Sequence, residues 1–244
     1  MSATLINYNG LGMMTFRAGM GFDSGLPSDE SLVGYWAFDD GSGSIAVDGS
    51  GQGNDGELVN MEDADWVDGV VGKALDFDGT NEAVAISGDI LNVADTPYAI
   101  SVWFKKDAGT SGTHGALICK DESTTHVQFY LGWLTGVFQF IYATANHVTG
   151  ALVYPAWDDI DNNWHHVTVG WDGTNAYLYA DGALIDSAAS NTLYAYTDQR
   201  TAIGRYGGYD GYYFPGLIDE VRIYSSALTA SEIKALYDYP GGKG

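Results

Sequence analysis

Cysteine is almost missing from this sequence, in which Cys119 is the only one among 244 residues. An internal disulfide is therefore excluded, and cysteine pairing says nothing about export to an oxidising compartment. Cys119 lies in the apolar segment ALICK. This setting favours a buried, inert thiol, because a cysteine nucleophile needs a base beside it.

Basic residues are also scarce, with 10 Lys and Arg against 32 Asp and Glu and a formal net charge of −22. Such a charge repels a nucleic-acid backbone, so nucleic-acid binding is excluded as a function. The excess of carboxylates favours solubility and would also attract divalent cations. Composition alone leaves both interpretations open.

Long apolar runs are lacking as well. Residues 1–30 contain no basic segment followed by a continuous apolar stretch, so we expect neither a classical signal peptide nor a membrane-inserted span. This segment instead scatters large apolar side chains among glycines too frequent for a helix. We interpret residues 1–30 as an extended arm that docks onto a larger protein assembly. The alternative is a first strand or a flexible leader of the same domain.

The sequence is rich in strand and turn residues, with 33 Gly, 17 Tyr and 7 Trp. From residue 31 onward, short alternating apolar segments are separated by turns such as Asp172-Gly173 and Asp181-Gly182, which are typical of hairpins. Strands joined this closely must be antiparallel, and their number implies two stacked sheets. We therefore predict one all-β domain over residues 31–240.

The segment LIDEVRIY, residues 217–224, alternates apolar with charged side chains, as a half-buried strand does. Further on, Thr229 and Glu232 have the spacing of a capping box, and Ile233, Leu236 and Tyr237 fall on one face of a short helix. We expect this helix to close the domain.

This C-terminal stretch resembles the signature of the laminin-G-like, concanavalin-A-like jelly-roll family, in which a glycine-rich turn precedes G-x-I-D-E-V-R-I-Y and an A-L-S/T-x-x-E-I helix. The segments at 32–58 and 164–185 fit the same family's order, so the resemblance covers roughly Ser31 to Tyr239. It implies a two-sheet antiparallel jelly-roll sandwich with a short C-terminal helix.

Acidic residues in the segment at 39–55 are spaced by Gly and Ser, which let the chain fold back so that oxygens converge as Ca²⁺ requires. The run is not an EF-hand loop. Relatives in the resembled family often hold a structural calcium between this segment and the later I-D-E strand. The resemblance implies Asp39, Asp48, Asn54 and Asp219 as ligands; alternatively, these residues form Asx turns.

No catalytic residues are predicted. His165 and His166 adjoin in a strand, so one should face the core and the other solvent, in a structural role. The E-x-D-x-x-E strand of β-glucanases is missing, and Asp219 and Glu220 are adjacent and should point to opposite faces, unlike a glycosidase pair. No G-x-S-x-G elbow is present either. We therefore expect a protein that is not an enzyme.

Aromatic side chains crowd the loop RYGGYDGYYFPG, which is too short to bury them all. Exposed tyrosines offer stacking surfaces and hydroxyls to sugars, and equally to proteins. The candidate ligand-binding residues are Trp133, Trp157, Arg205, Tyr206, Tyr209, Asp210, Tyr212 and Tyr213. The alternative for each is packing over the open end of the sandwich.

Together these features predict a non-enzymatic module that binds a glycan or cell-surface polysaccharide. The docking arm and the missing signal predict display on a larger assembly, such as the capsid or tail of a phage virion, and hence an extracellular or virion-surface location. Self-association is left open. The alternatives are a purely structural or protein-interaction sandwich and, more remotely, an accessory domain of a glycoside hydrolase.

Overall fold

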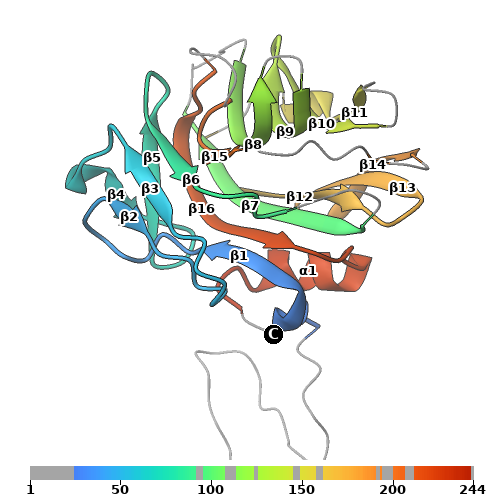
Figure 1. Cartoon of the computed structure of the whole chain (residues 1–244), viewed down its shortest axis with the longest axis horizontal. Coiled ribbons are helices and arrows are strands. Elements are labelled where there is room, and N and C mark those ends of the chain that lie inside the picture. The colour runs from blue at the N-terminus through green and yellow to red at the C-terminus, as the bar shows by residue number, and fades with distance from the viewer. Residues whose placement is uncertain are drawn as a thin grey trace, which may run out of the picture.

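The computed structural model describes residues 25–91, 96–107, 114–123, 126–144, 149–157, 162–190, 193, 200–206 and 212–242. Most of the predicted arm, residues 1–24, and the candidate residues Tyr209 and Asp210 lie outside the described residues. The described chain forms two antiparallel β-sheets and one α-helix, as predicted (Figure 1).

The first sheet, sheet A, has eight strands, and its long central strands β7 and β16 pair along nearly their whole length. In spatial order the sheet contains β14 (Ala183–Ala189), β13 (Asn175–Ala180), β12 (His165–Trp171), β7 (Tyr98–Lys106), β16 (Pro215–Tyr224), β5 (Lys73–Asp78) and β4 (Trp66–Asp68), with β1 (Leu32–Trp36) paired to β16.

The second sheet, sheet B, also has eight strands. Its order is β11 (Thr149–Val153), β10 (Val137–Ala143), β9 (His126–Leu134), β8 (His114–Ser123), β15 (Arg200–Ile203), β6 (Ala83–Ile86), β3 (Gly56–Val59) and β2 (Ile45–Ala46). Short 3-10 helices lie at η1 (Asp29–Ser31), η2 (Asp63–Asp65) and η4 (Pro155–Trp157).

The predicted hairpins are present. Asp181 and Gly182 join β13 to β14 as a two-residue loop in which both residues have positive φ, 48° and 77°. This is the backbone of the turn that matches the natural twist of two antiparallel strands, and Asp-Gly favours it because both residues tolerate positive φ. The local sequence was therefore sufficient to place this connection.

The main core lies between the two sheets. Val102 of β7 and Ile218 of β16 in sheet A pack in one cluster with Leu117 of β8 in sheet B, and the rings of Phe104 and Phe138 lie 6.1 Å apart across the interface. All five side chains are fully buried. Each stabilises the fold by roughly 1.5–3 kcal/mol relative to an exposed side chain.

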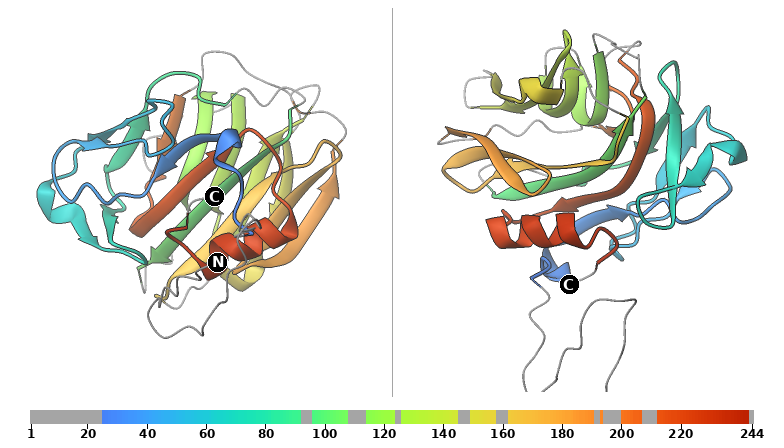
Figure 2. Two further views of the ribbon diagram at one scale, coloured as in Figure 1. Left: turned by 90° about the horizontal axis from the view of Figure 1, so that it is seen from below. Right: turned by 180° about the vertical axis from the view of Figure 1, so that it is seen from behind.

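A second packing layer lies on the other face of sheet A, under the helix α1 (Ala230–Asp238) (Figures 1 and 2). Thr229 and Glu232 form the predicted capping box, with the Thr229 N–H donating to Glu232 Oε2 at 2.7 Å. Ile233 and Leu236 of α1 are buried against Tyr224 of β16. The helix thus closes the domain as expected.

The helix also overturns one prediction. His166 was expected to face solvent if His165 faced the core, yet His166 is fully buried on the α1 side, with its ring 6.2 Å from that of Tyr237. His165 lies toward the core, 5.2 Å from the Trp157 ring. The two histidines do lie on opposite faces of β12, as predicted. The sequence of one strand could not show that α1, which is distant in the chain, covers the second face.

Strand β16 departs from the half-buried pattern predicted for it. Asp219, Glu220 and Arg222 are all buried, and the register with β7 shifts between Asp219 and Arg222. Glu220 has φ 52°, a left-handed conformation that is strained for a residue with a side chain. The bulge breaks strict alternation here, so the charged side chains of β16 do not form one solvated face.

The buried charges of Glu220 and Arg222 on β16 are paired with each other. Arg222 Nη2 donates to Glu220 Oε2 at 2.5 Å and to the Pro240 carbonyl at 2.7 Å, and its guanidinium lies 4.4 Å from the centre of the Tyr35 ring. Burial raises the pKa of Glu220, and Arg222 acts against that rise. Residues 25–30 also pack on this side, where Leu26 contacts the cluster under α1.

Candidate functional site

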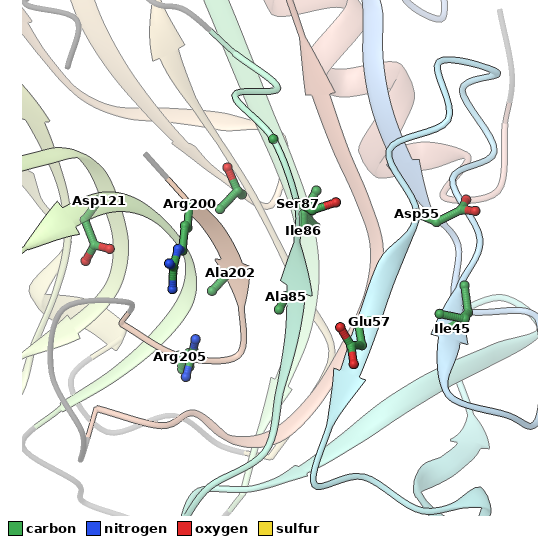
Figure 3. A pocket seen from close by; sticks show the side chains of 12 residues that line it. Ile45, Asp55, Glu57, Ala85, Ile86, Ser87, Asp121, Arg200, Ala202 and Arg205 are labelled. Atoms are coloured by element: carbon green, nitrogen blue, oxygen red, sulfur yellow. The ribbon is translucent and has the colours of Figure 1, made fainter. Parts of the chain in front are cut away.

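An open groove of about 700 Å³ lies on the face of sheet B that points away from the core. It crosses β2, β3, β6, β15 and β8 (Figure 3). Neighbouring strands lie about 4.8 Å apart, so these five strands span roughly 19 Å, the length of a short oligosaccharide. The volume is also typical of small-ligand sites.

The cross-strand register explains why this face is hollowed. Ala85 of β6 lies opposite Ala202 of β15, and Ala202 lies opposite Cys119 of β8. These side chains point outward because their neighbours Val84 and Ile203 enter the core. Ala85 and Ala202 form a low floor, and Glu57, opposite Ala85 on β3, lines one side of the groove.

The two ends of the groove carry opposite charge. Asp55 and Glu57 line the β3 end, whereas Arg200 and Arg205 line the end near β8, beside Asp121 (Figure 3). Arg200 lies directly opposite Asp121 in the strand register. The groove therefore offers acceptors for hydroxyl groups at one end and guanidinium donors at the other.

Arg205 is held at the groove by a turn that requires glycine. Gly204 ends β15 with φ 81°, and a Cβ atom there would lie 2.2 Å from the Phe77 ring. The backbone of Arg205 then forms an isolated antiparallel β-bridge with the backbone of Tyr213. The Nε atom of Arg205 is buried and has no hydrogen-bond partner in the described part of the chain.

The two tryptophans proposed as stacking surfaces are core residues, so this part of the prediction is wrong. Trp133 is 1% exposed and Trp157 is 5% exposed, and the Trp133 Nε1–H donates to the Trp157 carbonyl at 2.7 Å. Both rings pack around Phe138. The alternative interpretation, packing within the sandwich, describes these two residues.

The described tyrosines of the loop RYGGYDGYYFPG differ in how deeply they are buried. Tyr206 is 8% exposed and packs its ring 5.5 Å from Tyr130 and 5.7 Å from Tyr212, in a cluster that includes buried Cys119. Tyr212 stacks on His114 at 3.9 Å. Tyr212 and Tyr213 are half-buried. This cluster backs the arginine end of the groove, and of the predicted binding residues that the structure describes, Arg205 alone lines the groove.

The four predicted calcium ligands fall into two groups. Asp48 accepts hydrogen bonds from the backbone of Tyr35, Ser50 and Asn54 and from the Ser50 hydroxyl, at 2.7–2.9 Å. Burial alone would raise the pKa of Asp48, but these hydrogen bonds outweigh it and lower the pKa. The Asn54 amide donates to the Val33 carbonyl at 2.8 Å. Both residues thus have the turn-forming role of the alternative interpretation.

Asp39 and Asp219 instead flank the turn at residues 69–73. Asp39 Oδ1 accepts from the Lys73 N–H at 2.7 Å, and Asp219 Oδ2 accepts from the Val70 N–H at 2.9 Å. Asp219 Oδ1 is buried with no hydrogen-bond partner among the described residues. Burial, and secondarily Glu220, raise the pKa of Asp219 to about 8. No three His, Cys, Asp or Glu of the described segments gather as a metal cluster, and calcium binding by the four residues stays a prediction.

Sequence reasoning missed most of the groove. Glu57, Ala85, Arg200 and Ala202 come from three strands, β3, β6 and β15, that meet only through non-local strand pairing. The available signal was weak: Arg200 and Arg205 are two of only 10 basic residues, and five positions separate them.

Comparison with known proteins places the chain in a family. Residues 78–234, more than half of the chain, match the model described as the concanavalin A-like lectin/glucanases superfamily. The chain belongs to this superfamily. No curated protein sequence is similar enough to count as a relative. Within the described residues, no helix has the length and apolar character needed to cross a bilayer.

Solved structures share the fold at low sequence identity. Domain 4 of AbnA, an extracellular GH43 arabinanase from Geobacillus stearothermophilus solved with arabinotriose, has a TM-score of 0.67 and 22% identity, covering 85% of this chain and 98% of that one. The binding domain of Paraclostridial Mosquitocidal Protein 1 has a TM-score of 0.66 and 18% identity, covering 86% of this chain and 52% of that one. The receptor-binding domain of botulinum neurotoxin C/D mosaic serotype has a TM-score of 0.66 and 15% identity, covering 86% of this chain and 51% of that one. The chain thus spans about half of these toxin domains.

Proposed function

We propose that this protein is a carbohydrate-binding module that holds an oligosaccharide in the groove on the outer face of sheet B. The observation that carries the proposal is the groove itself: a low floor at Ala85 and Ala202 between sides that can hydrogen-bond hydroxyl groups. Membership of a lectin superfamily and the fold shared with a domain solved with arabinotriose support it.

Binding without catalysis is part of the proposal. Glycoside cleavage needs two carboxyl groups across the scissile bond, one with a raised pKa. In the described residues, the carboxyl groups whose pKa is raised are Asp76, Glu82, Asp219 and Glu220, and none of them lines the groove. The carboxylates at the groove are therefore assigned to hydrogen bonding.

A glycan array of the whole chain, run with and without a chelator, tests the proposal. We expect bound oligosaccharides to be lost when Ala85→Phe fills the floor. The matched control is Ala151→Phe, which adds the same ring to an exposed position on β11 of the same sheet, outside the groove. Binding to no glycan, or equal binding by both variants and the wild type, would remove the groove as the site.

We propose further that residues 1–24 dock the module on a larger assembly, such as a virion surface, in an extracellular setting. The geometry of the exit supports this. Leu26 packs on the α1 side of sheet A, opposite the groove on sheet B, so a chain leaving there would leave the groove facing outward.

Removing residues 1–24 tests this docking role. We expect the shortened chain to keep its melting temperature and its glycan binding, because the contact of Leu26 with the cluster under α1 and the pairing of β1 with β16 remain. A fall in melting temperature of several degrees would show instead that residues 1–24 are part of the sandwich.

A structural calcium ion also stays a proposal, now centred on Asp219 and Asp39. The buried, unpartnered Oδ1 atom of Asp219 supports it. When bound, such an ion would neutralise the buried carboxylate and tie β16 to the turn at 69–73. Asp48 and Asn54 are assigned to the turn that they hydrogen-bond.

A further inference from the structure

The arginine end of the groove is unusual for this chain. The described residues contain three arginines: Arg222 is buried and donates to Glu220 and to the Pro240 carbonyl, whereas Arg200 and Arg205 both line the groove. In a protein of net charge −22, two cations gathered at one end of one hollow on an acidic surface point to a ligand that carries negative charge.

The charge balance indicates how much negative charge the ligand carries. Arg200 and Arg205 contribute two positive charges, and the carboxylate of Asp121 opposite Arg200 offsets one, so this end has a net charge of about +1. At the other end, Asp55 and Glu57 repel anions and accept hydrogen bonds from hydroxyls. A polyanion is thereby excluded, while a chain with one acidic unit and otherwise neutral hydroxylated units fits.

The chemistry of guanidinium narrows the acidic group. Arg205 is half-buried and lines this end of the groove, and a guanidinium can donate two parallel hydrogen bonds to one planar carboxylate. Arg200, the first residue of β15, is exposed and lines the same end of the groove (Figure 3). The floor at Ala202 leaves room for the ring that carries the carboxylate.

We propose that the groove selects an oligosaccharide with a single sugar carboxylate, which lies between Arg200 and Arg205 while neutral sugar units cross Ala202 and Ala85 toward Glu57. This inference rests on the proposed glycan-binding function and adds the chemical class of its ligand. Uronic acids and sialic acids share the sugar carboxylate, and they differ in ring size and in the substituents around it.

The test measures the affinity of the full chain for two acidic probes and their neutral counterparts. The first pair is a neutral oligosaccharide chain ending in one glucuronate and the same chain with that carboxyl methyl-esterified, and the second is 3′-sialyllactose and lactose. At least one acidic probe should bind about tenfold or more tightly than its counterpart, because charge-assisted hydrogen bonds are replaced by weaker neutral ones. Raised salt should reduce this preference. The pair that shows the preference identifies the class of sugar acid.

Arg205→Gln and Arg200→Gln should each weaken binding of the acidic probe about tenfold more than binding of its neutral counterpart, so that the preference for the acidic probe is lost. Arg200 is exposed, so its variant should fold even if Arg205→Gln does not. Lys234→Gln is the matched control, since it removes the same charge from α1 on the far side of the sandwich.

The outcomes distinguish the proposal of an acidic ligand from the proposal of glycan binding in general. Equal affinity for acidic and neutral probes, or an unchanged preference in both arginine variants, would refute the acidic ligand and leave glycan binding in place. If neither acidic nor neutral probes bind, and the array shows no other glycan, the proposed function itself fails.

Discussion

The buried histidine under α1 gives a prediction that can be worked through from the structure. His166 is fully buried, and its Nε2 atom lies 2.8 Å from the Ser101 hydroxyl. Burial, followed by the nearby Arg222, lowers its pKa to about 3, and Asp181 opposes this shift only weakly. We expect His166 to stay neutral in the folded protein at every pH at which the protein is folded.

The sign of the effect follows from proton linkage. In the unfolded chain the histidine takes up a proton as the pH falls below about 6.5, while in the folded protein it does so only near the lowered value. The stability that depends on a neutral His166 is therefore fully present above about pH 6.5 and is lost on acidification. The loss is about 1.4 kcal/mol per pH unit, or about 3 kcal/mol by about pH 4.5.

The perturbation is His166→Gln, which keeps a polar group near the Ser101 hydroxyl and removes the titration. The assay is the free energy of unfolding in urea at a series of pH values. Near neutral pH the variant should be the less stable protein, because an amide fits the ring's place poorly. Below about pH 6 the difference should shift in favour of the variant by about 1.4 kcal/mol per unit.

Ser101→Ala is the control, because it removes the hydrogen-bond partner of His166 and keeps the histidine. It should lower stability by about 1–3 kcal/mol and retain the acid sensitivity of the wild type. If the curves of the wild type and His166→Gln stay parallel from neutral to acidic pH, the histidine takes up its proton equally in both states and the reasoning is refuted.

Three further predictions concern the core, the buried ion pair and the metal. Trp133→Ala should lower the free energy of unfolding by about 3–5 kcal/mol, measured in urea; a variant of wild-type stability that loses glycan binding would return Trp133 to the site. Arg222→Met should lower the free energy of unfolding by about 3–5 kcal/mol, because it leaves Glu220 buried without its cation. Adding Glu220→Gln should recover part of that loss. If the two substitutions instead lower the free energy of unfolding additively in a double-mutant cycle, the two side chains are not coupled. Calcium added after chelator treatment should raise the melting temperature of the wild type and not of Asp219→Asn, with magnesium as the control; a wild type indifferent to calcium would argue against the ion.

Local chemistry explains which structural predictions succeeded. The Thr229 cap and the Asp181-Gly182 turn depend on residues within a few positions of one another, so their side-chain and backbone preferences suffice. The family signature in Gly216 to Ile233 likewise led to the sandwich, which the comparison confirms. These features need no knowledge of which strands pair.

Predictions about burial failed where distant segments cover a surface. The exposure expected for Trp133 and Trp157 followed from their positions in apparent loops, but the chain folds both indoles around Phe138. The charged residues of β16 were expected on a solvated face, but the Tyr35 ring of β1 and the Pro240 carbonyl after α1 contact Arg222 instead. The alternation of side chains along a strand predicts which residues share a face, and it does not predict which segments pack against that face.

Composition and local pattern by themselves determined that this protein is an acidic, antiparallel sandwich with a capped C-terminal helix, because strand alternation, turn residues and caps act over short distances in the chain. Only the tertiary structure decided where a ligand could lie. The groove exists because non-local pairing sets Ala85 opposite Ala202 and brings Arg200 beside Asp121, and such register depends on contacts between segments more than a hundred residues apart in one case and about eighty in the other.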